Sequence, residues 1–374
     1  MLKLKVAIVG CGKIADAHVL QLQRLTGCEV VAVCDREELM ARQLQERFGI
    51  QRSFSDLADM VREAKPDVVH ITTPPQSHFE IASQCLAAGC HVYVEKPFTL
   101  YGAEAEKLVA LANEKRLCLT AGHDEQFSHA MQRMRALIRS GYLGGPPVHL
   151  ESTWCYELDA GAYTSALFRD KSHWVRKLPG RLLHNVISHG VAKIAEHLAD
   201  DHPTIIAYGF GSRPMQASGE TEIVDELRVI IASRDGTTAY FTFSSQMRPG
   251  LKQFSIFGSR NGLLVDENKQ ILLKLRGKRY KSFAEMFVPS VTLAGQLLRN
   301  LLHNGRLFLA SDFHSDTGKK YLIESFYRSI VEKTPVPIPY REILLTARIM
   351  EAIFQQLPGG SAHEPPKAKI DDRG

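Results

Sequence analysis

The feature that most constrains the fold is a short apolar run, Lys5–Val9, that ends in a glycine turn and leads directly into an amphipathic stretch. This order predicts a strand, a tight turn and a helix. Glycine at position 10 permits the sharp turn, glycine at position 12 lets the backbone approach a phosphate, and the small Ala15 lets helix and strand pack closely. The free N–H groups and the dipole at such a helix start attract anions. The turn is therefore predicted to hold the pyrophosphate of a dinucleotide through Gly10, Cys11, Gly12, Lys13 and Ile14.

A second apolar run, Glu29–Cys34, ends in an acid about 20 residues beyond the glycine turn. A carboxylate at Asp35 would accept hydrogen bonds from the adenosine ribose hydroxyls and repel a 2′-phosphate, which favours NAD over NADP. Arg36 follows directly, and because a guanidinium can accept a 2′-phosphate, NADP is the alternative cofactor. The plain structural alternative for Asp35 is an exposed turn aspartate.

More strand–helix units follow along the first third of the chain. Strands are expected at 66–73, 90–94 and 117–121, and helices at 37–48, from 56, at 77–88 and at 103–115. Repeated units with short connections predict a doubly wound parallel sheet, here an N-terminal Rossmann domain of residues 1–122. Ligands of such sheets bind at the carboxyl ends of the strands, where Gly10, Asp35, Thr73 and Glu95 fall.

The pattern changes from residue 123. Strands are expected at 148–156, 222–233, 237–246, 253–257, 263–266 and 271–275, and helices at 128–140, 185–198, 283–303, 312–333 and 340–356. This predicts an α+β domain, residues 123–357, whose large, mainly antiparallel open sheet is covered by helices on one face. Its last helix, 340–357, is a candidate to pack back on the Rossmann domain. The free sheet face is predicted to form a homodimer or homotetramer, and residues 358–374 a disordered tail.

Composition narrows the class of protein. Of 374 residues, 44% are hydrophobic and 23% charged, which is ordinary for a soluble globular chain of two domains. The net charge of +5 does not argue for a nucleic-acid partner, but it suits an anionic small substrate. Seven scattered cysteines without a C-x-x-C pair predict reduced thiols and a cytoplasmic protein. The N-terminal apolar run is too short for a signal peptide, and no stretch reaches the roughly 18 apolar residues of a membrane span.

The second chemical signal is Glu95-Lys96-Pro97, at the end of the expected strand 90–94. A desolvated ammonium at the carboxyl edge of the sheet can hydrogen-bond a substrate hydroxyl and stabilise the oxyanion that develops as hydride leaves. Burial would also lower its pKa and bring proton exchange within reach. Taken alone, the tripeptide is as well explained by a surface turn.

Together the glycine turn, Asp35, Thr73-Pro74-Pro75 with His78, and Glu95-Lys96-Pro97 resemble the Gfo/Idh/MocA family of glucose–fructose oxidoreductase and inositol dehydrogenase. The resemblance continues through 141–144, 257–262 and 326–330. It implies a Rossmann domain followed by an α/β domain with an oligomerising sheet. It also implies an NAD(P)-dependent dehydrogenase acting on the CH–OH group of a sugar, cyclitol or nucleotide sugar. The roles implied are catalysis for Lys96, and cofactor contacts for Thr73, Pro74, His78, Glu95 and Pro97.

The family also carries an aspartate and a histidine four residues apart on a helix that lines the substrate pocket. By resemblance these positions are Asn185 and His189, so the histidine is present and the aspartate is replaced. A neutral imidazole can take the substrate hydroxyl proton, while asparagine orients the ring without supplying charge. His189 is alternatively a hydrogen-bonded core histidine. Trp174 and Arg176 resemble the family's substrate loop, with Arg176 as an anion contact or, alternatively, a solvated arginine beside a buried tryptophan.

Three further features of the sequence concern metal binding, alternative functions and a basic segment. His184 and His197 lack a companion ligand, so no metal site is predicted. The loss of the family aspartate leaves two other functions as alternatives, a non-catalytic NAD-binding sensor or regulatory protein and an NAD-using glycosidase or lyase. Basic residues at 274–281 precede a helix rich in leucine and phenylalanine. This segment could dock on an anionic membrane, or be a solvated charge run before a helix packed on its own domain or a partner subunit.

Overall fold

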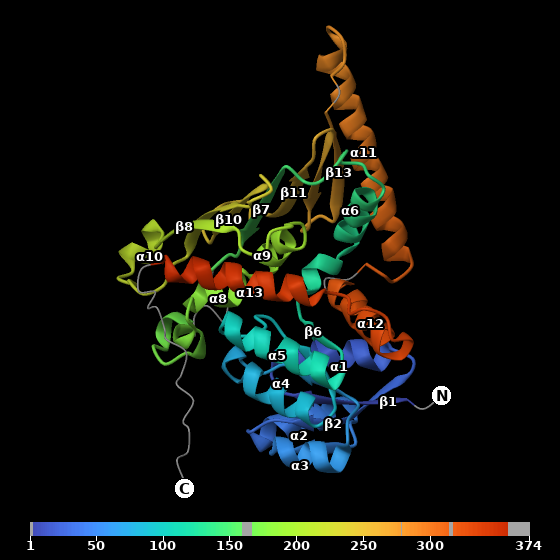
Figure 1. The fold of residues 1–374 in the computed structure, drawn as a ribbon, viewed down its shortest axis with the longest axis vertical. Helices are drawn as coiled ribbons and strands as arrows, with labels where there is room; N and C mark the ends of the chain where they lie inside the picture. The colour runs from blue at the N-terminus through green and yellow to red at the C-terminus, as the bar shows by residue number, and fades with distance from the viewer. Residues whose placement is uncertain (1–2, 159–166, 278, 314–316, 358–374) are drawn as a thin grey trace.

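The computed structural model describes residues 3–158, 167–277, 279–313 and 317–357; the tail predicted at 358–374 lies outside the described residues. The described chain forms two sheets that lie in separate halves of the molecule, one from the N-terminal strands and one from the later strands (Figure 1). Each half has its own hydrophobic core.

The first sheet contains six parallel strands in the order β3-β2-β1-β4-β5-β6. They are β1 Leu4–Val9, β2 Cys28–Cys34, β3 Arg52–Phe54, β4 Val68–Ile71, β5 His91–Val94 and β6 Leu119–Ala121. This is the strand order of a doubly wound dinucleotide-binding fold, so the predicted Rossmann architecture is confirmed. All four residues of β4 are buried, because a parallel sheet is covered by helices on both faces.

The helices of this half follow their strands as predicted. They are α1 Lys13–Arg24, α2 Glu38–Phe48, α3 Leu57–Ala64, α4 His78–Ala87 and α5 Gly102–Lys115. Local chemistry sets their ends. Asp56 caps α3 by accepting a hydrogen bond from the Asp59 N–H at 2.9 Å, and Gly49, with φ of +64°, ends α2 in the left-handed conformation that glycine tolerates.

The second sheet has seven strands in the order β13-β12-β11-β7-β10-β9-β8. They are β7 His149–Cys155, β8 Thr204–Phe210, β9 Glu226–Ala232, β10 Thr238–Ser244, β11 Lys252–Phe257, β12 Asn261–Asp266 and β13 Ile271–Arg276. Among the described strands of this sheet, β7 and β10 form the only parallel pair, which confirms a mainly antiparallel sheet. The edge strand β8 was not predicted, because its apolar residues fall on both faces: Ile206 and Tyr208 are exposed.

Two helices of the second half differ from their prediction. The single helix expected at 185–198 is two helices, α8 Arg181–Val186 and α9 Ser188–Ala195, with a break at Ile187. The two parts pack on different partners, α8 on the short helix η3 Trp174–Lys177 and α9 on β7 and α13. Tertiary contacts therefore determine where the helix is interrupted. The other helices are α6 His129–Arg139, α10 Arg213–Ala217, α11 Ala284–Leu309, α12 Thr317–Glu332 and α13 Tyr340–Gln355.

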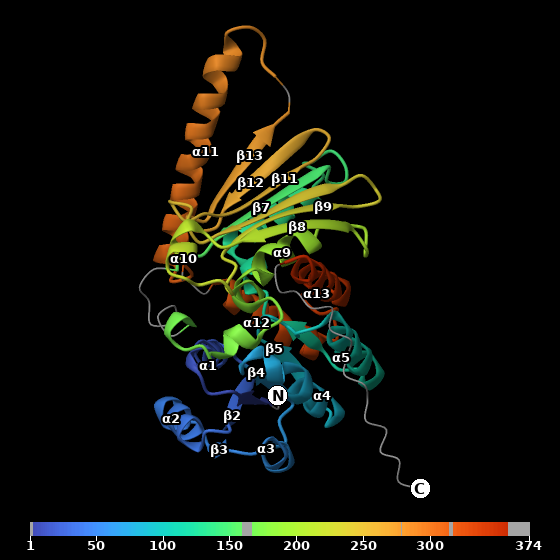
Figure 2. The same ribbon diagram turned by 90° about the vertical axis from the view of Figure 1, so that its left-hand side faces the viewer.

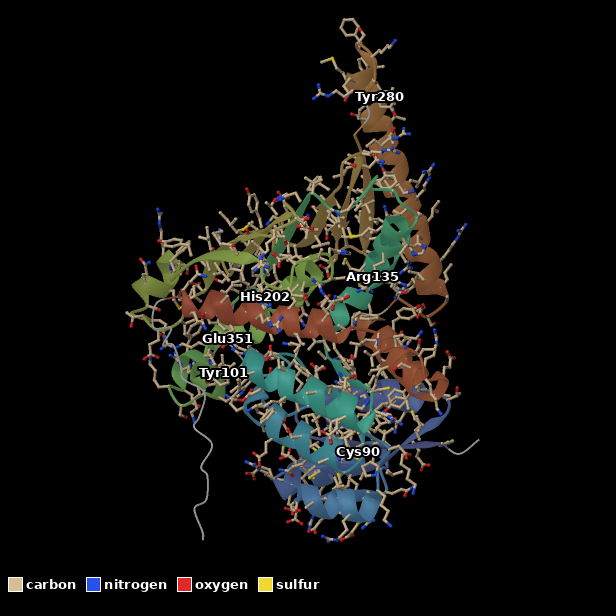
Figure 3. All side chains as sticks on the ribbon, in the orientation of Figure 1. Cys90, Tyr101, Arg135, His202, Tyr280 and Glu351 are labelled. Carbon is tan, nitrogen blue, oxygen red and sulfur yellow. The ribbon has the colours of Figure 1, made fainter. Side chains whose placement is uncertain are left out.

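The helix α13 lies across the boundary between the two halves (Figures 1 and 2). It packs on α5 of the Rossmann domain and on α9 beneath the second sheet. The Gly102 N–H donates to Glu351 Oε2 at 3.1 Å, and Figure 3 shows Glu351 close to Tyr101, the residue before α5. Its residues divide between the cores, with Ile343 in the first and Ile349 in the second. The helix α13 thus holds the second half against the Rossmann half.

All seven cysteines carry free thiols. Within the described ranges, no helix combines the length and the apolar character needed to cross a bilayer. Among the same residues, no group of three or more His, Cys, Asp and Glu side chains is arranged to hold a metal ion.

Candidate functional site

The glycine turn between β1 and α1 has the geometry of a phosphate cradle. Gly10 has φ of +95°, and a Cβ there would lie 2.6 Å from the Thr73 backbone nitrogen, so only glycine fits. A Cβ at Gly12 would meet no atom within 4 Å. Gly12 is the N-cap of α1, and the next two residues, Lys13 and Ile14, are exposed. The N-terminus of α1 therefore faces open space, as a pyrophosphate site requires.

Asp35, at the end of β2, is tied to the same turn. Its Oδ2 accepts a hydrogen bond from the Cys11 N–H at 2.7 Å, and its Oδ1 accepts one from the Glu37 N–H at 3.0 Å. These bonds fix the carboxylate beside the turn while leaving it partly exposed, with the exposed Arg36 next to it. Asp35, predicted to bind the ribose hydroxyls, and Arg36, the alternative contact for a 2′-phosphate, thus both lie at the edge of the cradle.

His78 supports this edge from behind. The imidazole is fully buried, and its Nε2 lies 2.8 Å from the Thr73 carbonyl oxygen and its Nδ1 2.9 Å from that of Pro97. The ring therefore connects the loop after β4 to the loop after β5. Thr73 is partly exposed and Pro74 exposed, so these two residues, rather than His78, present a surface to a cofactor.

Lys96 follows β5 and reaches toward the second half of the chain. Its Nζ donates a hydrogen bond to the Asn185 backbone carbonyl at 3.1 Å. Burial lowers the pKa of this ammonium from its ordinary value, while the carboxylates of Glu95 and Asp124 oppose the shift. The lysine thus stands where the two halves meet, with a pKa moved toward the range in which it can exchange a proton.

The single helix expected to carry both Asn185 and His189 is divided at Ile187, whose own backbone keeps helical dihedrals (φ −89°, ψ −14°). Asn185 is near the end of α8 and His189 at the start of α9. The contact between this segment and the catalytic lysine candidate is made by the Asn185 carbonyl oxygen. The residue type at 185 therefore matters less to that contact than the path of the backbone.

His189 is buried between the two halves, and its ring centroid lies 5.6 Å from that of Trp154 on β7. Burial holds the pKa of this imidazole well below its ordinary value, and the nearby charges of Lys96 and Lys193 lower it further. The ring is consequently neutral near pH 7. A neutral imidazole is the form that can accept a proton.

A carboxylate missed by the sequence reasoning lies next to this ring. Asp124, in the short helix η2 Asp124–Phe127, places its Oδ1 3.6 Å from His189 Nδ1 and its Oδ2 3.2 Å from the Nζ of Lys319 on α12. Burial raises the pKa of Asp124 to about 6, although Lys319 opposes the shift. The negative charge beside His189 therefore comes from η2. In the family pattern it comes from the helix that also carries the histidine.

A glycine is the one sequence feature that could have indicated the contact between α12 and Asp124. Gly318 lies in the first turn of α12, and a Cβ there would lie 2.2 Å from the Asp124 carbonyl oxygen. Its small size lets α12 approach η2 closely enough for Lys319 to reach the carboxylate. No motif marks Lys319 itself, which is almost completely buried.

Glu95, which was predicted to contact or shape the nicotinamide site, has its carboxylate in the core. Its buried carboxylate accepts hydrogen bonds through Oε1 from Lys319 Nζ at 2.5 Å and lies 2.8 Å from His18 Nε2. Burial alone would raise the pKa of Glu95, but Lys319 and His18 outweigh it and hold the pKa well below its ordinary range. The network continues from His18 to His70 at 2.8 Å and from His70 to Tyr327 at 3.1 Å. Glu95 therefore supports Lys96 from within the core.

The substrate-loop residues also have structural partners. The buried Arg176 guanidinium donates to Glu220 Oε2 at 2.6 Å, to Glu222 Oε2 at 3.1 Å and to the Leu167 carbonyl at 2.9 Å. Its charge is already matched, and it is not the solvated arginine of the alternative reading. Trp174 is half-buried, and its carbonyl accepts from Gln76 Nε2 at 2.9 Å.

Two ammonium groups lie over the Trp154 ring beside His189. The Nζ atoms of Lys193 and Lys252 are each 4.4 Å from the ring centroid. Lys193 is buried and ion-paired with Glu267, whereas Lys252 is partly exposed and 3.3 Å from Glu125 Oε1. The surroundings of the histidine therefore contain cations that are paired with carboxylates.

Comparison with known proteins matches the N-terminal part of the chain to an oxidoreductase family. Residues 4–123 match the model of the oxidoreductase family GFO_IDH_MocA, described as an NAD-binding Rossmann fold. The D-glucoside 3-dehydrogenase of Escherichia coli K12 is 33% identical over 142 residues, which cover 38% of this chain and 40% of that protein. The myo-inositol 2-dehydrogenase of Thermotoga maritima is 20% identical over 75% of this chain and 82% of its own length.

A solved structure extends the likeness to the whole fold. The WlbA dehydrogenase of Bordetella pertussis, solved with NADH and UDP-GlcNAcA, has a TM-score of 0.74 and covers 95% of this chain and 95% of its own. At 17% identity this likeness concerns the fold alone. In sequence, the chain spans less than half the length of the D-glucoside 3-dehydrogenase that it matches.

Proposed function

We propose, from the match of residues 4–123 to the Gfo/Idh/MocA oxidoreductase family, that this chain is an NAD-dependent dehydrogenase. Its substrate would be the secondary hydroxyl, or the corresponding ketone, of a sugar, cyclitol or nucleotide sugar, as the names of the relatives suggest. The observation that carries the proposal is the meeting of Lys96, His189 and Asp124 at the carboxyl edge of the parallel sheet. Ligands of doubly wound sheets bind at this edge.

The cofactor, when bound, exchanges the hydride with the substrate carbon. The glycine turn would hold its pyrophosphate, and Asp35 would accept hydrogen bonds from its ribose hydroxyls. Because the Asp35 carboxylate repels a 2′-phosphate, NAD is proposed rather than NADP. Thr73, which is partly exposed, and Pro74, which is exposed, are proposed as further contacts beside the turn.

The chain's own residues handle the proton. The Lys96 ammonium hydrogen-bonds the substrate oxygen and stabilises the alkoxide that develops during oxidation. The neutral His189 accepts the hydroxyl proton at Nε2, since its Nδ1 faces Asp124 at 3.6 Å. The Asp124 carboxylate then stabilises the imidazolium by its charge. This carboxylate offsets the replacement of the family aspartate by Asn185.

The protein is further proposed to act in the cytoplasm as a homo-oligomer. Support for the oligomer comes from the outer face of the second sheet, which carries exposed apolar side chains on β8, β9 and β10: Ile206, Tyr208, Ile230 and Tyr240. Light scattering of the purified chain, compared with Tyr208→Ser, tests this assembly. The seven free thiols support a reducing compartment.

The competing function is an NAD-binding sensor without turnover, which the asparagine at 185 favours. One experiment separates the two. D-glucosides, myo-inositol and UDP-N-acetylglucosamine are incubated with the protein and NAD, and NADH formation is followed by absorbance. Turnover that is lost in Lys96→Ala supports the dehydrogenase. Binding of NAD and of a sugar without any NADH, in wild type and variant alike, supports the sensor. Product formation without net NADH would instead indicate a glycosidase or lyase.

A further inference from the structure

The helix α11 has its polar and apolar faces reversed relative to an ordinary surface helix. The side chains that meet the edge strand β13 and the turn before it are amides. Asn300 donates to the Leu272 carbonyl at 3.0 Å and accepts from the Leu272 N–H at 3.0 Å, and Gln296 accepts from the Lys274 N–H at 2.7 Å. Asn304 donates to the Lys269 carbonyl at 3.1 Å. Three amides at four-residue spacing thus cover the open edge of the sheet, and α11 uses its polar face inward.

The opposite face of α11 is apolar and uncovered within the described residues. Phe283, just before the helix, is 75% exposed, and Leu309 at its end is 84% exposed. Between them a stripe of exposed large apolar side chains runs along the helix: Met286, Phe287, Val291, Leu298, Leu301, Leu302 and Phe308. A stripe of this length on one helix marks an interaction surface.

The segment is also strongly cationic. Residues 274–309 contain seven lysines and arginines and a single acid, Glu285, whereas the whole chain carries a net charge of only +5. Arg279 and Lys281 precede the helix, and Arg299 and Arg306 lie along it. The positive charge in and before this apolar helix therefore exceeds the net charge of the whole chain.

The shape of the molecule leaves the stripe accessible. The β13–α11 connection projects beyond the rest of the protein, with Tyr280 near its far end (Figures 2 and 3). Two α11 helices from different copies would bring two cationic segments together with only one acid each to offset them, which opposes self-association. An anionic lipid surface satisfies both properties at once, because its headgroups attract the basic residues and its acyl region takes the apolar stripe.

We propose that α11 and the basic residues before it form a peripheral membrane-docking element that binds anionic bilayers. The helix would lie in the plane of the interface, with the side chains of Phe287, Val291 and Leu298 inserted below the headgroups. The amide face would remain bonded to β13, so docking needs no change in the sheet. This property is separate from the proposed dehydrogenase activity.

Co-sedimentation of the full chain with vesicles tests the proposal. Binding is expected to vesicles that contain phosphatidylglycerol, and to be much weaker with phosphatidylcholine alone or at high salt. The paired change Phe287→Ser and Leu298→Ser should lower the partition coefficient at least about tenfold for each side chain removed from the acyl region. Arg279→Gln and Lys281→Gln should each lower it about fivefold.

Matched controls separate docking from misfolding and from self-association. Leu39→Ser with Val331→Ser removes two comparably exposed apolar side chains that lie outside both α11 and the sheet face, and should leave vesicle binding unchanged. NAD binding by every variant reports an intact fold. The proposal is overturned if wild-type protein does not bind anionic vesicles, or if the Phe287→Ser and Leu298→Ser variant dissociates an oligomer in lipid-free solution, because α11 would then be a contact between copies.

Discussion

Replacing Asp124 by asparagine keeps the shape of the side chain but removes the charge that faces His189. At an effective dielectric of about 20, a unit charge 3.6 Å from Nδ1 stabilises an imidazolium by about 4–5 kcal/mol. The Lys319 ammonium, bonded to the far carboxylate oxygen at 3.2 Å, cancels roughly half of this. The remaining effect of about 2 kcal/mol corresponds to a loss of roughly thirtyfold in kcat.

The pH dependence adds a second, independent readout. The pKa of Asp124 is raised to about 6 by burial, so in the wild type the carboxylate becomes neutral as the pH falls through this value. Wild-type kcat should therefore decline below about pH 6, and Asp124→Asn should lack this step while remaining slower above it. Steady-state NADH formation across the pH range measures both quantities with the substrate found by the screen.

Two comparisons show whether the lost charge is the cause of the lower kcat. Asp124→Asn should leave NAD binding unchanged, because the carboxylate lies away from the glycine turn. Adding Asn185→Asp to it returns a carboxylate to the position used in the family and should recover part of the lost rate. If Asp124→Asn matches the wild type in kcat at every pH, the electrostatic role assigned to this residue is wrong.

Three other outcomes follow from the same geometry. Lys96→Ala should lower kcat about 10²–10³-fold, since it removes the donor to the developing alkoxide, while Lys96→Arg should retain part of the rate. Gly10→Ala should destabilise the fold by at least about 2 kcal/mol in denaturant unfolding, because of its positive φ and the close Thr73 backbone. Gly12→Ala should instead leave unfolding unchanged and weaken NAD binding in calorimetry; equal stability losses in the two would contradict the cradle. Asp35→Ser should reduce the NAD to NADP ratio of kcat/KM about tenfold or more, and an unchanged ratio would show that another group selects the cofactor.

The N-terminal half was predictable because its determinants are local. The strand, glycine turn and helix are adjacent in sequence, and the requirement for glycine at position 10 arises from one tight turn. The acid at position 35 follows from the next strand. Repeated strand–helix units with short connections then restrict the topology to a parallel doubly wound sheet, which is the order observed.

For the second half, the type of sheet was predictable from the sequence, but not every strand and helix. Period-two patterns and hairpin turns indicated an open antiparallel sheet, yet the edge strand β8 was missed and one helix was expected where the structure has α8 and α9. An exposed edge strand with apolar residues on both faces lacks the alternation that identifies a strand. The break at Ile187 depends on what each helix packs against, so it cannot be predicted from the residues adjacent to it in sequence.

The sequence by itself determined the cradle: a glycine turn, its acid and a lysine at strand ends, each fixed by its immediate neighbours. Only the tertiary structure decided which charges act at the site. Glu95 turned inward to Lys319, Arg176 was matched by Glu220, and Asp124 took a place beside His189. These pairs join elements up to 224 residues apart. Because a buried charge needs a partner wherever the fold supplies one, its role follows from packing and not from spacing along the chain.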